Sequence, residues 1–195
     1  EMRKMVGGIA KGRRVLNCFS YTGGFSVFAA LNGAKKVDSV DDSEAAIEIA
    51  KKSVALNARF LRSSTSENIL ESVEMTYKVA DVFDYLRETS IDADFIILDP
   101  PAFAKKKADL KKACRAYQNL NRLAMEKIKT PGLILTCSCS YAVDERLFQQ
   151  IIFAAALEAG RKVRILSRHH QAFDHPINVY HPEGRYLKGF LLSVD

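Results

Sequence analysis

Short apolar segments alternate with amphipathic segments along most of the chain. The apolar segments predict β-strands at residues 14–18, 36–41, 76–81, 95–99, 132–139, 162–168 and 186–194. Residues 95–98 are Phe-Ile-Ile-Leu without a polar position, which is typical of a central strand buried on both faces. Strands that alternate with helices in this way predict an α/β fold with a mostly parallel sheet and helices on both faces.

The amphipathic segments predict helices at residues 24–31, 43–57, 84–89, 110–129 and 143–159. Ser43 is a suitable N-cap for the second helix, and Gly33 and Gly160 are suitable helix stops. In segment 110–129 the apolar residues recur at steps of three and four, so one face can be buried while the lysines and arginines stay in water. We interpret that apolar face as core packing.

Two segments lack a clear pattern. Residues 62–68 are polar and rich in serine, which predicts an exposed loop. Residues 1–13 are basic and contain glycine, and we interpret them as the remnant of a linker or preceding region, with one domain at residues 14–195. Because the chain opens on Glu1 rather than on methionine, we expect it to derive from a longer protein.

The composition is that of an ordinary globular protein. The 195 residues are 48% hydrophobic and 27% charged, which argues against disorder and coiled coils. No apolar run approaches the length of a membrane span, and the N-terminal residues lack an apolar signal core. Four unevenly spaced cysteines are too few for a secreted disulfide framework, so we expect reduced thiols in a cytoplasmic protein.

The positive charge is concentrated in one stretch. Residues 104–129 contain nine basic and two acidic residues, whereas the whole chain carries a formal net charge of +6. Clustered cations attract phosphate backbones through counterion release. A solvated helix face is the simpler interpretation of such a run, but its position directly after the segment at residues 99–103 favours an RNA contact.

The first predicted strand leads into a glycine turn. Residues 17–25 have the sequence Asn-Cys-Phe-Ser-Tyr-Thr-Gly-Gly-Phe, and the paired glycines permit a close approach of the backbone to a ligand. The second strand ends at Asp41, whose carboxylate can accept both hydroxyls of a ribose. Ligands of open α/β sheets bind at these carboxyl ends of the strands.

The third predicted strand ends in a second carboxylate. Asp81 can pair with an adenine amino group, and Val82 and Phe83 can pack on the ring. Alternatively, Asp41 or Asp42 caps the helix after the second strand and Asp81 caps the next helix. Taken together, the glycine turn and the two acidic strand ends favour an adenosyl ligand, and because the Gly-x-Gly-x-x-Gly spacing of dinucleotide sites is missing, we expect S-adenosylmethionine rather than a nicotinamide cofactor.

The fourth predicted strand is followed by Asp-Pro-Pro-Ala-Phe at residues 99–103. Pro100 and Pro101 rigidify the chain, and Phe103 offers a flat face on which a flipped base can stack. A proline turn with a core phenylalanine is the alternative. Because the segment follows the buried strand end Ile-Ile-Leu-Asp, we consider this alternative weaker than a substrate-binding role.

The fifth predicted strand ends in Thr-Cys-Ser-Cys-Ser at residues 136–140. Methylation of cytosine at C5 requires a thiolate to add at C6, whereas methylation of nitrogen requires no thiol. Cys137 and Cys139 are two positions apart and share a face of the strand. A zinc site is disfavoured because no second ligand pair accompanies them, and Cys18 and Cys114 are expected to be small hydrophobic residues.

Six segments together resemble the catalytic domain of RlmI-type methyltransferases, bacterial enzymes that make 5-methylcytosine in large-subunit ribosomal RNA. They are residues 17–25, 40–43, 81–86, 98–103, 136–140 and 181–189. The resemblance implies a Rossmann-like class I methyltransferase fold with seven strands and an antiparallel last strand. It also implies an N-terminal RNA-binding PUA domain and a connecting segment in full-length members, neither of which can be located in this sequence.

The resemblance also implies residue roles. Asp41 would hold the ribose, Asp81 the adenine and Asp99 the target base. Alignment with related C5 enzymes implies that Cys139 is the nucleophile, with Cys137 as second choice. One departure is Asp42, where a small polar residue is expected.

The candidate residues form three groups. The predicted cofactor-binding residues are Asn17, Phe19, Tyr21, Thr22, Gly23, Gly24, Asp41, Asp42, Asp81, Val82, Phe83 and Asp99. The predicted substrate-binding residues are Pro100, Pro101, Phe103, Lys105 and Lys106, and the predicted catalytic residues are Cys139, Cys137 and Asp99. Glu183, Tyr186 and Lys188 are expected to shape the substrate side without an assigned role, and the four late histidines are expected to be structural or surface residues.

The leading hypothesis is a cytoplasmic enzyme that methylates cytosine C5 in RNA, by resemblance 23S rRNA, with S-adenosylmethionine as cofactor and S-adenosylhomocysteine as product. It would bind no metal and no membrane, and a homodimer is left open. The alternatives are a guanine-nitrogen methyltransferase, a catalytically silent RNA-binding module and, with less support, an oxidoreductase.

Overall fold

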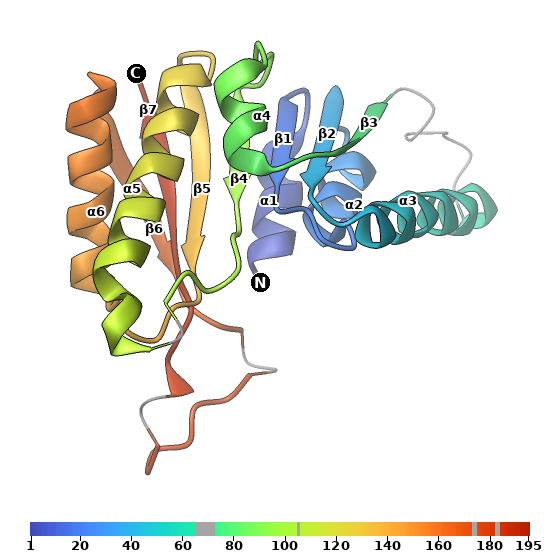
Figure 1. Cartoon of the computed structure of the whole chain (residues 1–195). Coiled ribbons are helices and arrows are strands. Elements are labelled where there is room, and N and C mark those ends of the chain that lie inside the picture. The colour runs from blue at the N-terminus through green and yellow to red at the C-terminus, as the bar shows by residue number, and fades with distance from the viewer. Residues whose placement is uncertain (65–72, 105, 173–174, 182–183) are drawn as a thin grey trace. The chain divides into compact units, whose positions relative to one another are not determined.

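The computed structural model describes residues 1–64, 73–104, 106–172, 175–181 and 184–195 (Figure 1). Within these residues, seven strands form a sheet in the order β3-β2-β1-β4-β5-β7-β6. The pairings of β1 with β2 and of β2 with β3 are parallel, whereas β7 is antiparallel to both β5 and β6. The predicted α/β fold with a mostly parallel sheet and an antiparallel last strand is therefore confirmed.

The chain divides into two compact units, Glu1–Ile97 and Leu98–Asp195. The first unit contains α1 (Met2–Ala10), β1 (Arg14–Cys18), α2 (Gly24–Leu31), β2 (Lys36–Asp41), α3 (Glu44–Ser64), β3 (Glu74–Val79) and α4 (Val82–Glu88). Strand β4 (Phe95–Leu98) ends at the boundary, and all four of its side chains are buried, as predicted for a central strand.

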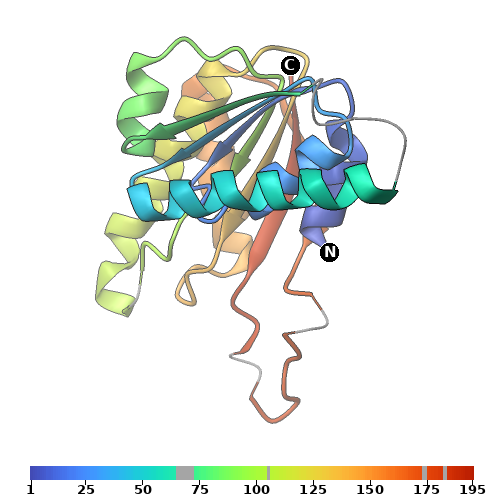
Figure 2. The same cartoon turned by 90° about the vertical axis from the view of Figure 1, so that its right-hand side faces the viewer.

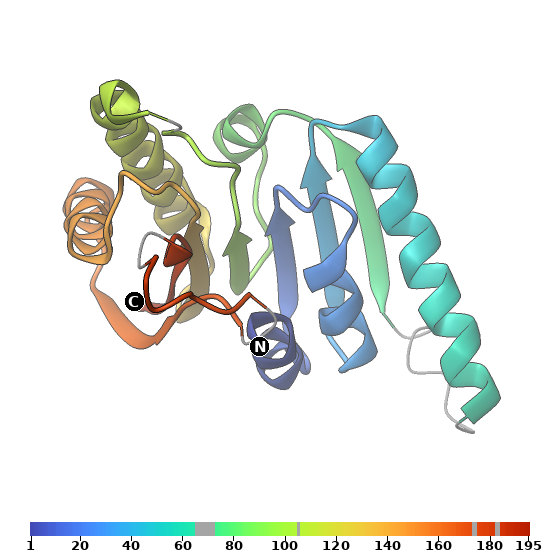
Figure 3. The ribbon, with the colours of Figure 1, turned by 90° about the horizontal axis from the view of Figure 1, so that it is seen from below.

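Helices α2 and α3 pack on one face of the first unit's strands (Figure 2). Side chains alternate along β1, so Asn17 faces α2, where its amide donates to the Ser26 hydroxyl, and Leu16 faces the opposite side. Helix α1 lies beside α2 (Figure 3). It buries Val6 and Ala10.

Several boundaries in the first unit differ from those predicted. The sequence pattern did not predict α1, and α3 continues to Ser64, so residues 62–64 are helical rather than part of a loop. Residues 65–68 of that predicted loop lie outside the described residues. Strand β3 ends at Val79 and α4 begins at Val82, because the Asp81 carboxylate accepts the backbone N–H of Asp84 (3.0 Å) and caps the helix.

The second unit contains α5 (Leu110–Lys127), β5 (Gly132–Ser138), α6 (Glu145–Ala159), β6 (Val163–His169) and β7 (Lys188–Val194). Helices α5 and α6 pack side by side (Figure 1). Between them and β7, the ring of Phe148 lies 5.5 Å from that of Tyr117 and 5.3 Å from that of Phe190. These three buried rings form an aromatic core that joins the two helices to the sheet.

In the described parts of the chain, no helix combines the length and apolar character that crossing a membrane requires.

We expect the substitution Phe148→Ala to lower the free energy of unfolding by about 3–5 kcal/mol, because it removes the ring that joins the other two and leaves a cavity. Phe153 lies on the same helix but is 64% exposed, so Phe153→Ala should change stability by less than about 0.5 kcal/mol. Urea denaturation monitored by circular dichroism measures both values. Equal losses in the two variants would contradict the aromatic core.

Candidate functional site

The loop between β1 and α2 has an uncommon backbone conformation. Phe19, Tyr21 and Gly23 all have positive φ, at 56°, 46° and 79°. The left-handed region costs a residue with a side chain about 1–2 kcal/mol, so such a loop needs contacts that hold it. Two hydrogen bonds to the end of β2 do so: the N–H of Ser20 donates to the carbonyl of Val40 (3.0 Å), and the N–H of Tyr21 donates to the carboxylate of Asp41 (2.8 Å).

Gly23 is required at its position for two reasons. Its φ is positive, and an added Cβ would lie 2.8 Å from the Cβ of Ala50. The glycine therefore lets the N-terminus of α2 approach α3 closely. The sequence correctly indicated a tight turn here, although the two glycines differ, because Gly24 has an ordinary helical conformation.

Asp41 is the carboxylate around which this loop is organised. Its side chain is buried and accepts the N–H groups of Tyr21 and of Ser43 (3.0 Å), while Asp42 is exposed. Ser43 caps α3 through its own hydroxyl, which accepts the N–H of Ala46 (3.2 Å), so neither aspartate is needed as the cap. Each oxygen of Asp41 retains lone-pair capacity for a further donor, such as a ribose hydroxyl.

The start of α4 faces the same loop. The rings of Phe19 and Phe83 are in edge contact, with centroids 6.5 Å apart and planes at 75°. Val82 is buried and Phe83 is half-buried. Asp81 is exposed and caps α4, so the alternative that this carboxylate caps the next helix is confirmed. One of its two oxygens already accepts a hydrogen bond there.

Asn17 lies inside the first unit. Its amide donates to the Ser26 hydroxyl (2.8 Å), which in turn lies 2.8 Å from the Ser39 hydroxyl, so the network braces β1 and β2 against α2. Among the described residues, the Asn17 Oδ1 and Ser20 Oγ atoms are buried without a hydrogen-bond partner. Buried polar atoms are nearly always paired, so these two oxygens fit a loop that receives a polar ligand.

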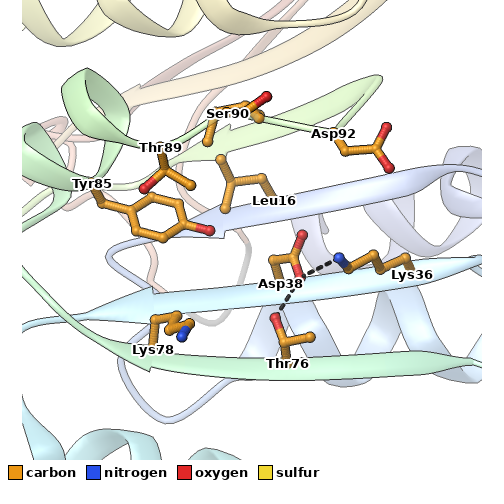
Figure 4. Close-up of a pocket in the computed structure, with 10 residues that line it drawn as sticks. Leu16, Lys36, Asp38, Thr76, Lys78, Tyr85, Thr89, Ser90 and Asp92 are labelled. Carbon is orange, nitrogen blue, oxygen red and sulfur yellow. Dashed lines mark hydrogen bonds and ion pairs between the residues drawn. The ribbon is translucent and has the colours of Figure 1, made fainter.

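A separate pocket of about 230 Å³ lies on the opposite face of the first unit's strands (Figure 4). Asp38 accepts the hydroxyl of Thr76 at its floor and forms an ion pair with Lys36 (3.3 Å), while Tyr85 and the segment after α4 form the other wall. None of the predicted site residues lines it. This polar pocket is therefore distinct from the glycine turn.

The second unit brings the proline segment and the cysteine segment together. The Cys139 sulfur lies 3.7 Å from the carbonyl oxygen of Pro100, so the segments that follow β4 and β5 lie side by side in this unit. Cys139 is half-buried and follows the last residue of β5, whereas Cys137 lies inside the strand with 1% of its surface exposed. Of the two thiols, only Cys139 can be reached by a substrate in this conformation.

The electrostatics also separate the two cysteines. Burial raises the pKa of the Cys137 thiol well above its ordinary value, and the Asp99 carboxylate raises it further. Burial followed by Asp99 also raises the pKa of Cys139, but a hydrogen bond with its own backbone and the nearby Lys188 cation lower it again. Thiolate formation is thus disfavoured at both positions, but less strongly at Cys139 than at Cys137.

Ser140 holds the turn that carries Cys139. Its buried hydroxyl accepts the N–H of Ala104 (3.1 Å) and lies 2.9 Å from the hydroxyl of Tyr117. Its carbonyl accepts a hydrogen bond from Lys188 Nζ (2.7 Å). One residue thereby connects the segment after β4, helix α5 and strand β7.

The predicted substrate-binding residues lie in the segment between β4 and α5. Pro100 is buried, Pro101 is exposed, and the half-buried ring of Phe103 lies 4.7 Å from that of Tyr117 at 51°. Lys106 is exposed, while Lys105 lies outside the described residues. The ring of Phe103 therefore packs against a core residue on one side, as the alternative of a core phenylalanine predicted, and the residue stays partly exposed.

The cations of the basic stretch fall into two groups. Lys106, Lys111, Lys112 and Arg115 are exposed near the start of α5. Farther along, Arg122 forms ion pairs with Glu126 (2.6 Å) and Glu158 (3.8 Å). The first group, close to the proline segment in sequence, is the part of the stretch suited to bind phosphate groups.

Sequence reasoning missed the supporting role of three residues. Tyr117 was interpreted only as a core residue, Ser140 only as part of a motif, and Lys188 received no role. The available signal was a lysine at the start of a mostly apolar strand, because an ammonium buried there needs hydrogen-bond acceptors. Its acceptors are backbone carbonyls, which the amino-acid sequence does not reveal.

Comparisons with known proteins identify the family to which the chain belongs. A family model described as S-adenosylmethionine-dependent methyltransferase matches residues 2–168. The ribosomal RNA large subunit methyltransferase I of Tolumonas auensis is 46% identical over 197 aligned residues, and that of Vibrio vulnificus is 43% identical, each covering 100% of this chain and 47% of the relative. The chain thus spans about half the length of these curated relatives.

A solved structure agrees as well. The crystal structure of SMU.776, a putative methyltransferase complexed with SAH, superimposes with a TM-score of 0.76 at 29% identity over 98% of this chain and 48% of the other. The resemblance drawn from the six motifs and the prediction of S-adenosylmethionine as cofactor are both confirmed. The chain belongs to the S-adenosylmethionine-dependent methyltransferase family.

Proposed function

We propose that this chain is the catalytic domain of an enzyme that methylates cytosine C5 in 23S ribosomal RNA through a covalent adduct on Cys139. The observation that carries the proposal is the half-buried Cys139 thiol beside the Pro100 carbonyl (3.7 Å). Carbon methylation requires such a nucleophile and nitrogen methylation does not. The names of the relatives support ribosomal RNA as the substrate.

The first unit supplies the cofactor residues. Asp41 would accept the ribose hydroxyls, and the Phe19 and Phe83 rings would pack against the adenine at the start of α4. The buried oxygens of Asn17 and Ser20 suit a polar ligand at the same loop. When bound, S-adenosylmethionine would supply an electrophilic methyl group and leave as S-adenosylhomocysteine.

The second unit supplies the groups that act on the base. The Cys139 thiolate adds to C6 of cytosine, the C5–C6 π electrons become available at C5, and C5 takes up the methyl group. A base then removes the C5 proton, and the electrons of that bond re-form the double bond and expel the thiolate. Asp99 would hold the exocyclic edge of the base, and the ring of Phe103 would stack on the base. The exposed cations at the start of α5 would bind the RNA backbone.

Cys139→Ala should lower methyl transfer by roughly 10³-fold or more, because the adduct can no longer form, while S-adenosylmethionine binding persists. Cys137→Ala is the matched control and should retain most of the activity, since Cys137 is buried within β5. The assay is methyl transfer to large-subunit ribosomal RNA, followed by mass-spectrometric mapping of the modified base.

RNA that contains 5-fluorocytidine gives a second readout of the same step. Fluorine cannot leave C5 as a proton does, so the adduct should accumulate as a denaturant-resistant protein–RNA complex in the wild type and not in Cys139→Ala. Full activity of the double variant Cys137→Ala/Cys139→Ala, or a methyl group on guanine nitrogen, would refute covalent C5 chemistry.

Asp41→Asn should weaken S-adenosylmethionine binding by about tenfold or more, because one oxygen that can accept a hydroxyl becomes an amide donor. Asp42→Asn is the control, since Asp42 is exposed and adjacent. Titration calorimetry measures both dissociation constants. Unchanged affinity in Asp41→Asn, or an equal loss in both variants, would remove Asp41 from the cofactor site.

A further inference from the structure

Lys188 is a buried cation at the start of β7. Only 5% of its surface is exposed, and its ammonium donates to the carbonyls of Ser140 (2.7 Å) and Tyr186 (2.7 Å). In the part of the chain that the structure describes, no carboxylate forms an ion pair with it. Burying an ammonium with only neutral carbonyls as hydrogen-bond partners costs free energy, so we expect a group nearby that this charge can stabilise.

The ammonium of Lys188 lies next to the backbone around Cys139. Lys188 is the partner of Ser138 in the pairing of β5 with β7, and its Nζ reaches the carbonyl of Ser140. It thus contacts the residues on either side of Cys139 in the chain. The Cys139 thiolate and the Lys188 ammonium stabilise each other electrostatically.

We infer that Lys188 is a positioning residue for the thiol of Cys139: it fixes the turn after β5 through two carbonyls and stabilises the thiolate with its charge. The inference rests on the proposed function for its purpose. Two of the three ammonium N–H bonds are used by Ser140 and Tyr186, and among the described residues the third has no acceptor, so it can donate to the sulfur or to the substrate.

The charges around this pair act in opposite directions. Asp99 raises the pKa of Cys139 and Lys188 lowers it, while the charge of Cys139 raises the pKa values of Cys137 and Tyr117. Asp144, at the start of α6, stabilises the Lys188 cation. Removal of the lysine charge leaves the Asp99 carboxylate unopposed near the sulfur.

The sign of the pH dependence follows from the pKa of Lys188. Burial lowers this pKa to about 8, against the opposing effects of Cys139 and Asp144, so the lysine is charged below about pH 8 and loses its charge above it. A thiol forms its thiolate as its S–H bond breaks and both electrons remain on sulfur. The proton goes to water, or to the Lys188 nitrogen once that nitrogen is neutral.

The test is the rate at which iodoacetamide alkylates Cys139 at different pH values, followed by mass spectrometry without RNA or cofactor. Only the thiolate reacts, so the profile reports the pKa of the thiol. Lys188→Met should slow alkylation of Cys139 about tenfold below about pH 8, where Lys188 is charged, and the two profiles should converge at higher pH, where the lysine is neutral. Lys188→Arg keeps the charge and should lie closer to the wild type.

Cys114 is the internal control. It lies on α5, is partly exposed, and its pKa is raised by burial without a contribution from Lys188. Its alkylation profile should be the same in all variants, whereas a general loosening of the fold would change both cysteines. Identical Cys139 profiles in the wild type and Lys188→Met would overturn the inference.

A second measurement does not depend on a substituted lysine. The nitrogen-15 chemical shift of the Lys188 side chain should titrate near pH 8 in the wild-type chain, and at lower pH in Cys139→Ser, which cannot supply the thiolate. Titration above about pH 10, the ordinary range of lysine, in both proteins would also overturn the inference. Neither experiment requires methyl transfer, so a failure of the proposed function is seen separately, in the RNA assay.

Discussion

The hydrogen bonds of Ser140 are the constraint on which the reactive half of the structure depends. Its hydroxyl accepts from the backbone of Ala104 and lies beside the Tyr117 hydroxyl, and its carbonyl accepts from Lys188. A buried polar group without a partner costs about 1–3 kcal/mol, so these contacts favour one arrangement of three separate chain segments. Cys139 precedes Ser140, and its position near the proline segment follows from that arrangement.

The cofactor half of the structure uses a carboxylate in a similar way. The loop after β1 contains two non-glycine residues with positive φ, Phe19 and Tyr21, and the Asp41 carboxylate at the end of β2 accepts the Tyr21 N–H. In both units, a loop that follows a strand is fixed by a buried polar side chain from elsewhere in the chain. Parallel strands bring their carboxyl ends to one edge of a sheet, which is why such contacts form there.

The sequence predicted the strands and the helix faces well, because apolar periodicity is a local property. The bounds of β1, β2 and α2 match those predicted. Helix α1 was missed because two glycines interrupt its pattern, and its burial depends on contacts with α2. The end of β3 was misplaced because Asp81 was assigned to the strand, whereas its carboxylate caps α4. The predicted roles of the site residues stay predictions, since they concern ligands.

The choice between the two cysteines shows most clearly what the sequence leaves open. Cys137 and Cys139 occupy alternate positions, so periodicity assigns both to one face, and only the point at which the β5 ladder stops distinguishes them. That point is set by tertiary pairing: Cys137 pairs with Gly189 and Ser138 with Lys188, and the strand ends there. Cys139 therefore lies just beyond the last pair, where it is partly exposed and where the ammonium of Lys188 reaches. The pairing that buries one thiol thus also brings a cation to the other.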